Sequence, residues 1–139
     1  MITKDTFRRG LRKGWSTTCA LTRVVIPVYI AVTFFKYTPV LNWIKEACAP
    51  VMHLFGLSGE AALPLVLGNI LNLYAALGAI ASLSLSSREI TILALMLLIS
   101  HNLPVESAVS GRTGVNALAM TGLRLGMSFL LGIILNLSL

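Results

Sequence analysis

Charged residues are scarce in this chain of 139 residues: Lys, Arg, Asp and Glu together make up 12 %, about half their share in an average soluble domain. Hydrophobic residues make up 56 %, and the mean hydropathy is +0.85. Residues 61–87 contain no charged side chain, and residues 113–139 contain only Arg124. Uncharged runs of about 18 residues or more can cross a bilayer. The sequence therefore predicts an all-α integral membrane protein and excludes a soluble globular domain.

Cysteine and the common catalytic motifs are also scarce or missing. Cys19 and Cys48 are the only cysteines, too few for a disulfide framework and without metal-ligand spacing. The chain lacks a phosphate-binding glycine loop and an HExxH sequence, and His101 and Glu106 have no obvious third catalytic partner. We therefore expect no enzyme activity, no metal site and no resident cofactor.

The net charge of +6 is concentrated at the start of the chain. Within residues 1–15, Asp5 is the only acidic residue, and five basic residues accompany it: Lys4, Arg8, Arg9, Arg12 and Lys13. Phe7, Leu11 and Trp15 alternate with them at helical spacing, which is typical of an amphipathic helix on a membrane surface. Anionic lipid headgroups explain such a basic stretch better than nucleic acid does, because apolar sequence follows it. We expect a lipid bilayer as partner and no nucleic acid.

After residue 15 the chain is predicted to form one membrane domain. Residues 16–35 are apolar enough for a first span, residues 88–110 for a second span that Pro104 breaks, and residues 114–137 for a third. Residues 38–56 instead place their apolar side chains on one helical face, as an interfacial helix does. These segments predict three transmembrane helices and one helix that lies at the membrane surface.

Residues 61–87 allow two interpretations. Gly68, Asn69 and Asn72 stand near the middle of this uncharged run, which suggests two arms that meet at a polar turn. A re-entrant hairpin of this kind is allowed at membrane depth if its turn is buried in protein or lines a watery cavity. The residue pattern fits equally well a single span, which would make the protein a four-span helical bundle.

The second span carries the most polar residues of any predicted membrane segment. His101, Asn102 and Glu106 surround Pro104, and intramembrane ionisable residues usually mark a solute or ion pathway. Pro104 also frees backbone carbonyls about one turn upstream. We therefore interpret His101, Asn102 and Glu106 as a substrate- or ion-binding group. Structural hydrogen bonding is the competing interpretation.

Two further elements complete the predicted site. Asn69 and Asn72, at the turn of the possible hairpin, would offer amide groups to the same ligand. Arg124 is expected to form a structural ion pair, with Glu106 as its natural partner, because an unpaired charge inside a bilayer is costly.

The order of these elements resembles the nucleoside-recognition, or gate, domain family. The resemblance depends on four places: Thr17-Thr18 with Ile26-Pro27, Gly56 to Glu60, Gly68-Asn69, and His101 to Glu106 followed by Gly111 and Gly114. Relatives of this family include the spore-maturation membrane proteins, the gate regions of ferrous iron transport protein B, and the core repeats of concentrative nucleoside transporters. The resemblance implies a span, an interfacial helix, a re-entrant hairpin, a broken span and a final span. For residues 61–87 it therefore favours a hairpin and not a single span.

The resemblance also implies that one copy is incomplete. The nucleoside transporters hold two such repeats in inverted orientation, whereas this chain holds one, and substrate sites in such folds lie where the repeats meet. We therefore expect a transporter-like half-unit that forms a dimer with a second copy or a paralogous membrane protein. Its ligand would be a small solute or an ion, with Na⁺ or H⁺ as possible coupling ion. A non-transporting scaffold or assembly factor with the same fold is the alternative.

The distribution of basic residues predicts one orientation in the cell membrane. With the N-terminus in the cytoplasm, Arg112 and the five basic residues of the first segment lie inside, and Lys36, Lys45 and Arg88 lie outside. This bias follows the positive-inside rule. It speaks against an antiparallel homodimer, and leaves a parallel oligomer or a paralogous partner open.

Overall fold

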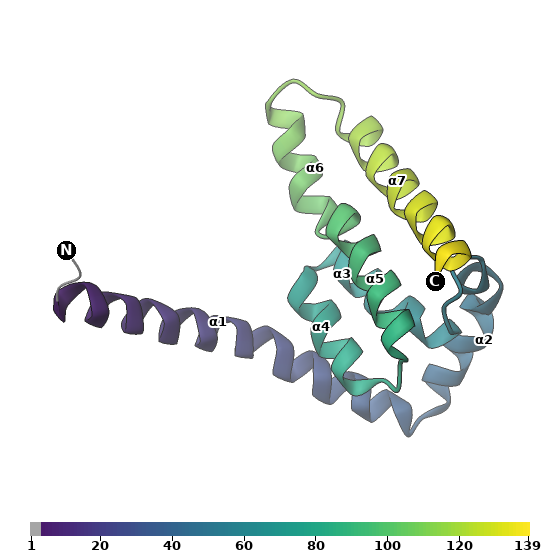
Figure 1. Ribbon diagram of the computed structural model, residues 1–139, viewed down its shortest axis with the longest axis horizontal. Coiled ribbons are helices and arrows are strands. Elements are labelled where there is room, and N and C mark those ends of the chain that lie inside the picture. The colour runs from purple at the N-terminus through teal and green to yellow at the C-terminus, as the bar shows by residue number, and fades with distance from the viewer. Residues whose placement is uncertain (1–3) are drawn as a thin grey trace.

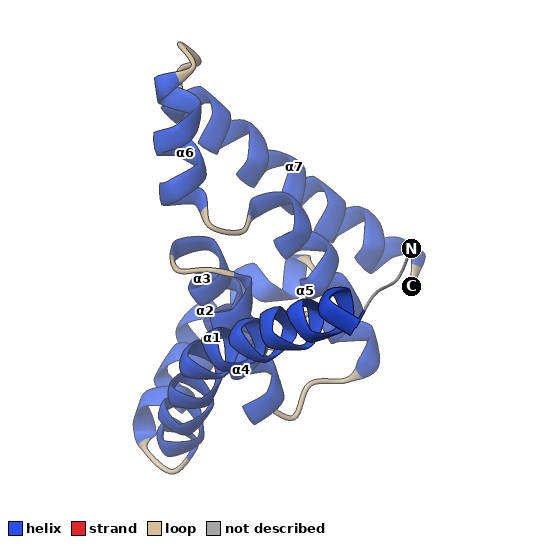
Figure 2. Ribbon diagram, turned by 90° about the vertical axis from the view of Figure 1, so that its left-hand side faces the viewer, coloured by secondary structure: helices blue, strands red, loops and turns tan. Residues whose placement is uncertain are grey.

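The computed structural model describes residues 4–139, and all its regular structure is helical (Figures 1 and 2). The described elements are α1 (Lys4–Lys36), α2 (Pro39–Leu54), the 3₁₀ helix η1 (Gly59–Ala61), α3 (Ala62–Ile70), α4 (Leu73–Ser82), α5 (Ser87–Ser100), α6 (Leu103–Arg112) and α7 (Ala117–Ser138). The predicted all-α fold is confirmed.

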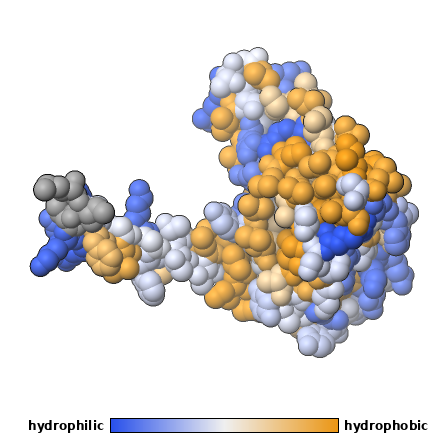
Figure 3. Space-filling view, in the orientation of Figure 1, coloured by the Kyte–Doolittle hydropathy of each residue, from blue (hydrophilic) through white to orange (hydrophobic). Residues whose placement is uncertain are grey.

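Three segments are long and apolar enough to cross a membrane: α1, the combined α5–α6 segment Ser87–Arg112, and α7. They agree with the three spans predicted from the sequence. The second and third contain 26 and 22 residues, or about 39 and 33 Å at the helical rise of ~1.5 Å per residue. In this chain alone α7 buries only Ser128 and Gly132, and hydrophobic residues cover its C-terminal half in Figure 3. Such a surface fits contact with lipid.

The first helix corrects the predicted boundary at residue 15. Residues 1–15 and 16–35 were expected to form an amphipathic helix and a separate span, but α1 runs without interruption from Lys4 to Lys36. Gly14 lies at the expected junction, and a single glycine costs only about 1 kcal/mol inside a helix. The C-terminal half of α1 packs against α4, while its N-terminal half extends away from the other helices (Figure 1).

Helices α3 and α4 form a hairpin whose turn is Leu71 and Asn72. The two helices pack against each other and contain only 9 and 10 residues. A Cβ atom on Gly68 would lie 2.5 Å from Leu97 Cδ2 and 3.0 Å from Ala76 Cβ, so glycine permits α3 to approach both α4 and α5. The four-span alternative requires one continuous helix over residues 61–87, and the structure has two helices there instead.

Helix α2 turns sharply into this hairpin. The axis bends by 93° between Pro39–Leu54 and Gly59–Ile70, and Gly56 at the corner has a φ of 65°, which favours glycine. The last turn of α2 buries Met52 in the core, where Phe55, Leu93 and Met96 are its neighbours in the same cluster. The helix agrees in extent with the predicted segment 38–56.

Polar side chains at the N-terminal end of α5 connect it to neighbouring helices. Arg88 donates to the carbonyl of Gly56 at 3.1 Å and to Asn136 Oδ1 at 2.8 Å, which joins α5 to the corner after α2 and to α7. Glu89 closes a capping box with Ser86. These contacts set the relative positions of α2, α5 and α7, and hence of the residues at the break between α5 and α6.

Candidate functional site

Two interruptions of regular helix meet inside the fold. Helix α5 ends at Ser100 and α6 begins at Leu103, while the turn of the α3–α4 hairpin follows Ile70. The backbone N–H of Asn102 donates to the carbonyl oxygen of Gly68 at 2.9 Å. This hydrogen bond joins the break between α5 and α6 to the last turn of α3. The break and the hairpin turn therefore lie next to each other, at the same height along the helix bundle.

The local sequence explains why the break occurs here. Pro104 occupies the first turn of α6, where a missing N–H is tolerated, and it cannot continue α5. Asn102 adopts a left-handed conformation with φ 54° and ψ 40°, and it is the only non-glycine residue with positive φ between residues 4 and 139. Asparagine enters this region more readily than most residues. The chain therefore changes direction at His101 and Asn102, just before the proline.

Arg124 of α7 holds the two sides of the break together. Its guanidinium forms an ion pair with Glu106 of α6. Its Nε donates to the carbonyl of Ile99 at 2.8 Å, and Nη2 donates to the carbonyl of His101 at 3.4 Å. The cation thus binds carbonyls near the end of α5, which lose their helical partners at the break, together with the carboxylate on the next helix.

His101 completes a row of three ionisable side chains. Its Nδ1 lies 2.9 Å from the carbonyl oxygen of Leu97; a carbonyl only accepts, so Nδ1 must carry the proton in this contact. The other ring nitrogen, Nε2, lies 3.7 Å from Glu106 Oε1. In the neutral imidazole the lone pair on Nε2 therefore faces the carboxylate, and a second proton would create an attraction between them.

Two amide oxygens at this level lack a hydrogen-bond donor. Among the described residues, Asn69 Oδ1 and Asn102 Oδ1 are buried and unpartnered. Asn69 is only 9 % exposed. An unsatisfied buried acceptor costs about 1–3 kcal/mol, so both atoms are suited to accept a hydrogen bond or to coordinate a cation. The nearby C-terminal ends of α3 and α5 add partial negative charge.

Asn72 has a different position from the other predicted site residues. Its side-chain oxygen accepts a hydrogen bond from the backbone N–H of Ala75 at 3.0 Å and caps the N-terminus of α4. The structure thus brings together His101, Asn102, Glu106 and Arg124, and the bond to Gly68 brings the α3 end with Asn69 beside them. The Asn72 oxygen is already used as the cap of α4, so it stabilises the hairpin turn.

The sequence did not predict a pair of hydrogen-bonded hydroxyl groups between the end of α5 and α7. Ser100 Oγ and Ser128 Oγ are buried and lie 3.1 Å apart, and Ser128 also donates to the carbonyl of Met96 at 3.0 Å. Ser107 and Thr121 form a second hydroxyl contact between α6 and α7. Small hydroxyl residues inside apolar helices are the signal that could have indicated these contacts.

The residues that the structure describes contain no group of three or more His, Cys, Asp or Glu side chains able to hold a metal ion. The polar atoms at the break are instead amide and carbonyl oxygens, one carboxylate, one imidazole and one guanidinium. Chemically, this set can accept hydrogen bonds from a polar solute, coordinate a hard cation through oxygen, or exchange a proton.

Comparisons with known proteins identify similar chains. A family model described as "Gate: Nucleoside recognition" matches residues 20–135. The chain is 46 % identical over 134 residues to the membrane protein YvoD of Bacillus subtilis, a match that covers 96 % of this chain and 43 % of YvoD. It is 35 % identical over 121 residues to the inner membrane protein YjiG of Escherichia coli K12, covering 81 % of this chain and 77 % of YjiG. The chain thus spans less than half the length of YvoD. No solved structure matches it.

Proposed function

Because this chain belongs to the nucleoside-recognition (Gate) family of membrane proteins, we propose that it forms half of a pathway for a small polar solute or an ion across the cell membrane. The observation that carries the proposal is the hydrogen bond between Asn102 N–H and the Gly68 carbonyl. It aligns a broken span with a hairpin turn, and polar binding sites in secondary transporters are typically built from such discontinuous helices.

The lengths of the helices support a site near the middle of the bilayer. Helix α5 has 14 residues before the break and α6 has 10 after it, which correspond to about 21 and 15 Å. Helices α3 and α4 contain 9 and 10 residues, or about 14–15 Å each, half of the ~30 Å hydrocarbon core. We therefore propose that the hairpin is re-entrant, with its turn at the depth of Asn102.

The chemistry of the site supports Na⁺ or H⁺ as the coupling ion. Asn69 Oδ1 and Asn102 Oδ1 are unpartnered oxygens of the kind that Na⁺ or a solute hydroxyl would bind. Glu106 and His101 are the groups at this level able to exchange a proton. We propose that these residues bind and release a ligand without catalysing a reaction.

A second unit would complete the pathway. The side chains of His101 and Glu106 are 31 % and 43 % exposed, so the described chain covers the site on one side only. The part of YvoD outside the match is longer than the matched part, since the match covers 43 % of it. We propose that a second copy or a related membrane protein covers the open side. We further propose that the N-terminus of α1 lies in the cytoplasm, which its positive charges support.

Reconstitution tests the proposal directly. The purified chain in proteoliposomes should take up radiolabelled uridine, or ²²Na⁺ itself, above the level of protein-free liposomes when a Na⁺ or H⁺ gradient is imposed. Asn69→Ala and Asn102→Gly should reduce uptake at least about tenfold, since each removes one oxygen ligand worth ~1.4 kcal/mol or more. Glycine at 102 retains access to the left-handed conformation. Asn42→Ala, an exposed position on α2, is the matched control.

Uptake no greater than in protein-free liposomes under either gradient would count against a pathway. Full uptake by Asn69→Ala, Asn102→Gly and Glu106→Gln would instead show that the site is assigned to the wrong residues. The chain should be tested alone and together with any co-purifying membrane protein, because a complete pathway would need a second unit.

One observation favours a scaffold as the second candidate. Arg124 already neutralises Glu106 and binds two carbonyls at the break, so these charges have structural partners without any ligand. A scaffold would fold and assemble normally but bind neither Na⁺ nor uridine. Normal assembly together with the absence of binding would therefore select this candidate.

A further inference from the structure

The N-terminal half of α1 projects from the protein as an uncovered helix. Every residue from Lys4 to Thr18 is exposed, and Figure 1 shows this part of α1 leaving the other helices. The contacts of α1 with the body lie further along: Val32 is buried, and Lys36 Nζ donates to the carbonyl of Ser82 at 2.8 Å. Nothing in the described chain therefore covers the basic segment.

Helix α1 is too long for all of it to lie within the hydrocarbon core of a bilayer. Helix α1 contains 33 residues, which correspond to about 50 Å, whereas the hydrocarbon core of a bilayer is ~30 Å thick. About 20 Å of helix must therefore lie in the headgroup layer or beyond it. The basic residues identify which end this is, because five of them lie in residues 4–13.

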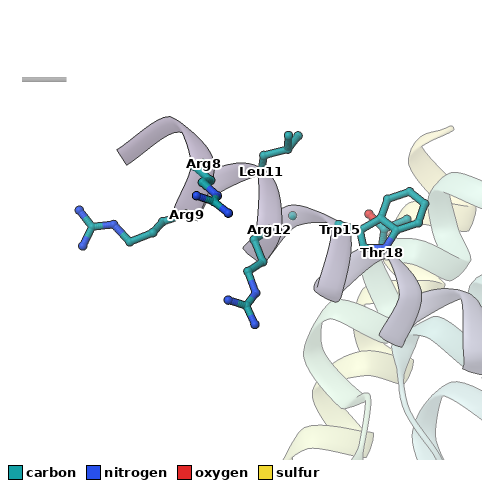
Figure 4. Close-up of a pocket in the computed structure, with 8 residues that line it drawn as sticks. Arg8, Arg9, Leu11, Arg12, Trp15 and Thr18 are labelled. Atoms are coloured by element: carbon teal, nitrogen blue, oxygen red, sulfur yellow. The ribbon is translucent and has the colours of Figure 1, made fainter. Parts of the chain in front are cut away.

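The segment has two chemically different sides. Phe7, Leu11 and Trp15 recur every four residues and are 71 %, 67 % and 72 % exposed, so they form one apolar stripe along the helix. In Figure 4, Arg9 and Arg12 extend away from the side that Leu11 occupies. Arg9 also donates to the carbonyl of Asp5 at 3.3 Å. None of Arg8, Arg9 and Arg12 forms an ion pair with a residue between positions 4 and 139.

We infer that this segment of α1 is a binding site for the headgroups of anionic phospholipids, independent of the proposed transport function. The guanidinium groups of Arg8, Arg9 and Arg12 bind the lipid phosphates through charge-assisted hydrogen bonds. Leu11 and Trp15 enter the boundary between headgroups and acyl chains, where Trp is preferred. A parallel second copy is a poorer occupant, because it would place the same positive charges against each other.

Lipid-specific quenching of Trp15 tests this site in the full chain. The protein has two Trp residues, so Trp43→Phe leaves Trp15 as the single reporter. The chain is reconstituted into bilayers of phosphatidylcholine with about one phosphatidylglycerol in five, and bromine is placed on the acyl chains of one lipid or the other. Per brominated lipid, phosphatidylglycerol should quench Trp15 at least about threefold more than phosphatidylcholine, because each basic residue near an anionic surface contributes attraction.

Two sets of variants separate charge from folding. Combined Arg8→Gln, Arg9→Gln and Arg12→Gln should lower the quenching ratio to about one, and the three Lys substitutions should retain most of it, since the attraction depends on charge. Glutamine is a good helix former, so the helical circular dichroism should not change. Lys45→Gln, which removes an exposed charge from α2, should leave the ratio unaltered.

Three results would overturn the inference. Equal quenching by the two lipids in the parent chain would show that the segment does not select anionic lipid. A preference that survives the three Gln substitutions would assign the selection to other residues. Quenching by neither lipid would show that Trp15 is in water or covered by protein, including a second copy.

Discussion

Replacing Arg124 by methionine removes the charge that joins the two sides of the break and keeps much of the side-chain volume. The variant loses the ion pair with Glu106, the 2.8 Å bond to the Ile99 carbonyl and the longer bond to the His101 carbonyl. A hydrogen bond from a charged group contributes about 1.5 kcal/mol or more. The ion pair is discounted to about 1 kcal/mol, because the Glu106 side chain is 43 % exposed. We therefore expect a loss of about 3–4 kcal/mol, with the upper value applying if the 3.4 Å bond contributes as much as the 2.8 Å bond.

The loss can be measured as the free energy of unfolding in mixed micelles, with increasing sodium dodecyl sulfate and far-ultraviolet circular dichroism as the signal. Glu106→Gln alone should cost about 1–2 kcal/mol. The double variant should cost less than the sum of the two by about 1 kcal/mol, because the residues share one interaction. Arg23→Met, at an exposed position of α1, controls for the removal of an arginine. A cost for Arg124→Met below about 0.5 kcal/mol, or additive costs, would refute the structural role of this pair.

Two further substitutions test the packing of the bundle and the hairpin. Gly132→Ala should destabilise the protein by about 1–3 kcal/mol, because a Cβ atom there would lie 2.7 Å from Met96 Sδ and 2.9 Å from Phe55 Cδ1. Gly126→Ala, whose Cβ would meet no atom within 4 Å, should unfold at the same or a higher denaturant concentration than the parent, because alanine is the better helix former. Asn72→Ala should cost about 1 kcal/mol through loss of the α4 cap, while Asn72→Asp should keep it; equal stability of the two would disprove the capping role.

The spans could be predicted from the sequence because their signal is composition. Apolar runs of sufficient length identified the second and third spans to within a few residues of Ser87–Arg112 and Ala117–Ser138. The boundary at residue 15 was wrong for the same reason, since it was placed where the composition changes from basic to apolar. Backbone hydrogen bonding does not depend on that change, and α1 continues through it.

The hairpin was beyond the residue pattern alone. Residues 61–87 are apolar almost throughout, so periodicity cannot distinguish one buried helix from two. The turn is determined by contacts between distant parts of the chain: Gly68 fits against Leu97, and its carbonyl accepts from Asn102. Only the resemblance to a family with a hairpin favoured the arrangement that the structure shows.

The polar residues at the break illustrate the same limit. Glu106 and Arg124 are the only charged residues well inside their two spans, so their proximity followed from the cost of isolated charges. The roles of the asparagines did not follow from residue type. Asn69 leaves its oxygen unpartnered, Asn72 uses its oxygen as a cap, and Asn102 bends the backbone. These differences depend on the geometry around each side chain.

The ion pair between Arg124 and Glu106 also determines the electrical behaviour of the proposed site. With these two charges paired and His101 neutral, the side chains of the proposed site carry no net charge when no ligand is bound. A neutral solute would then enter and leave without electrical work, whereas a bound Na⁺ or proton would add one elementary charge. Moving that charge through the membrane potential changes the free energy by about 2.3 kcal/mol per 100 mV. Current recorded across the membrane would therefore reveal whether a cation accompanies the solute.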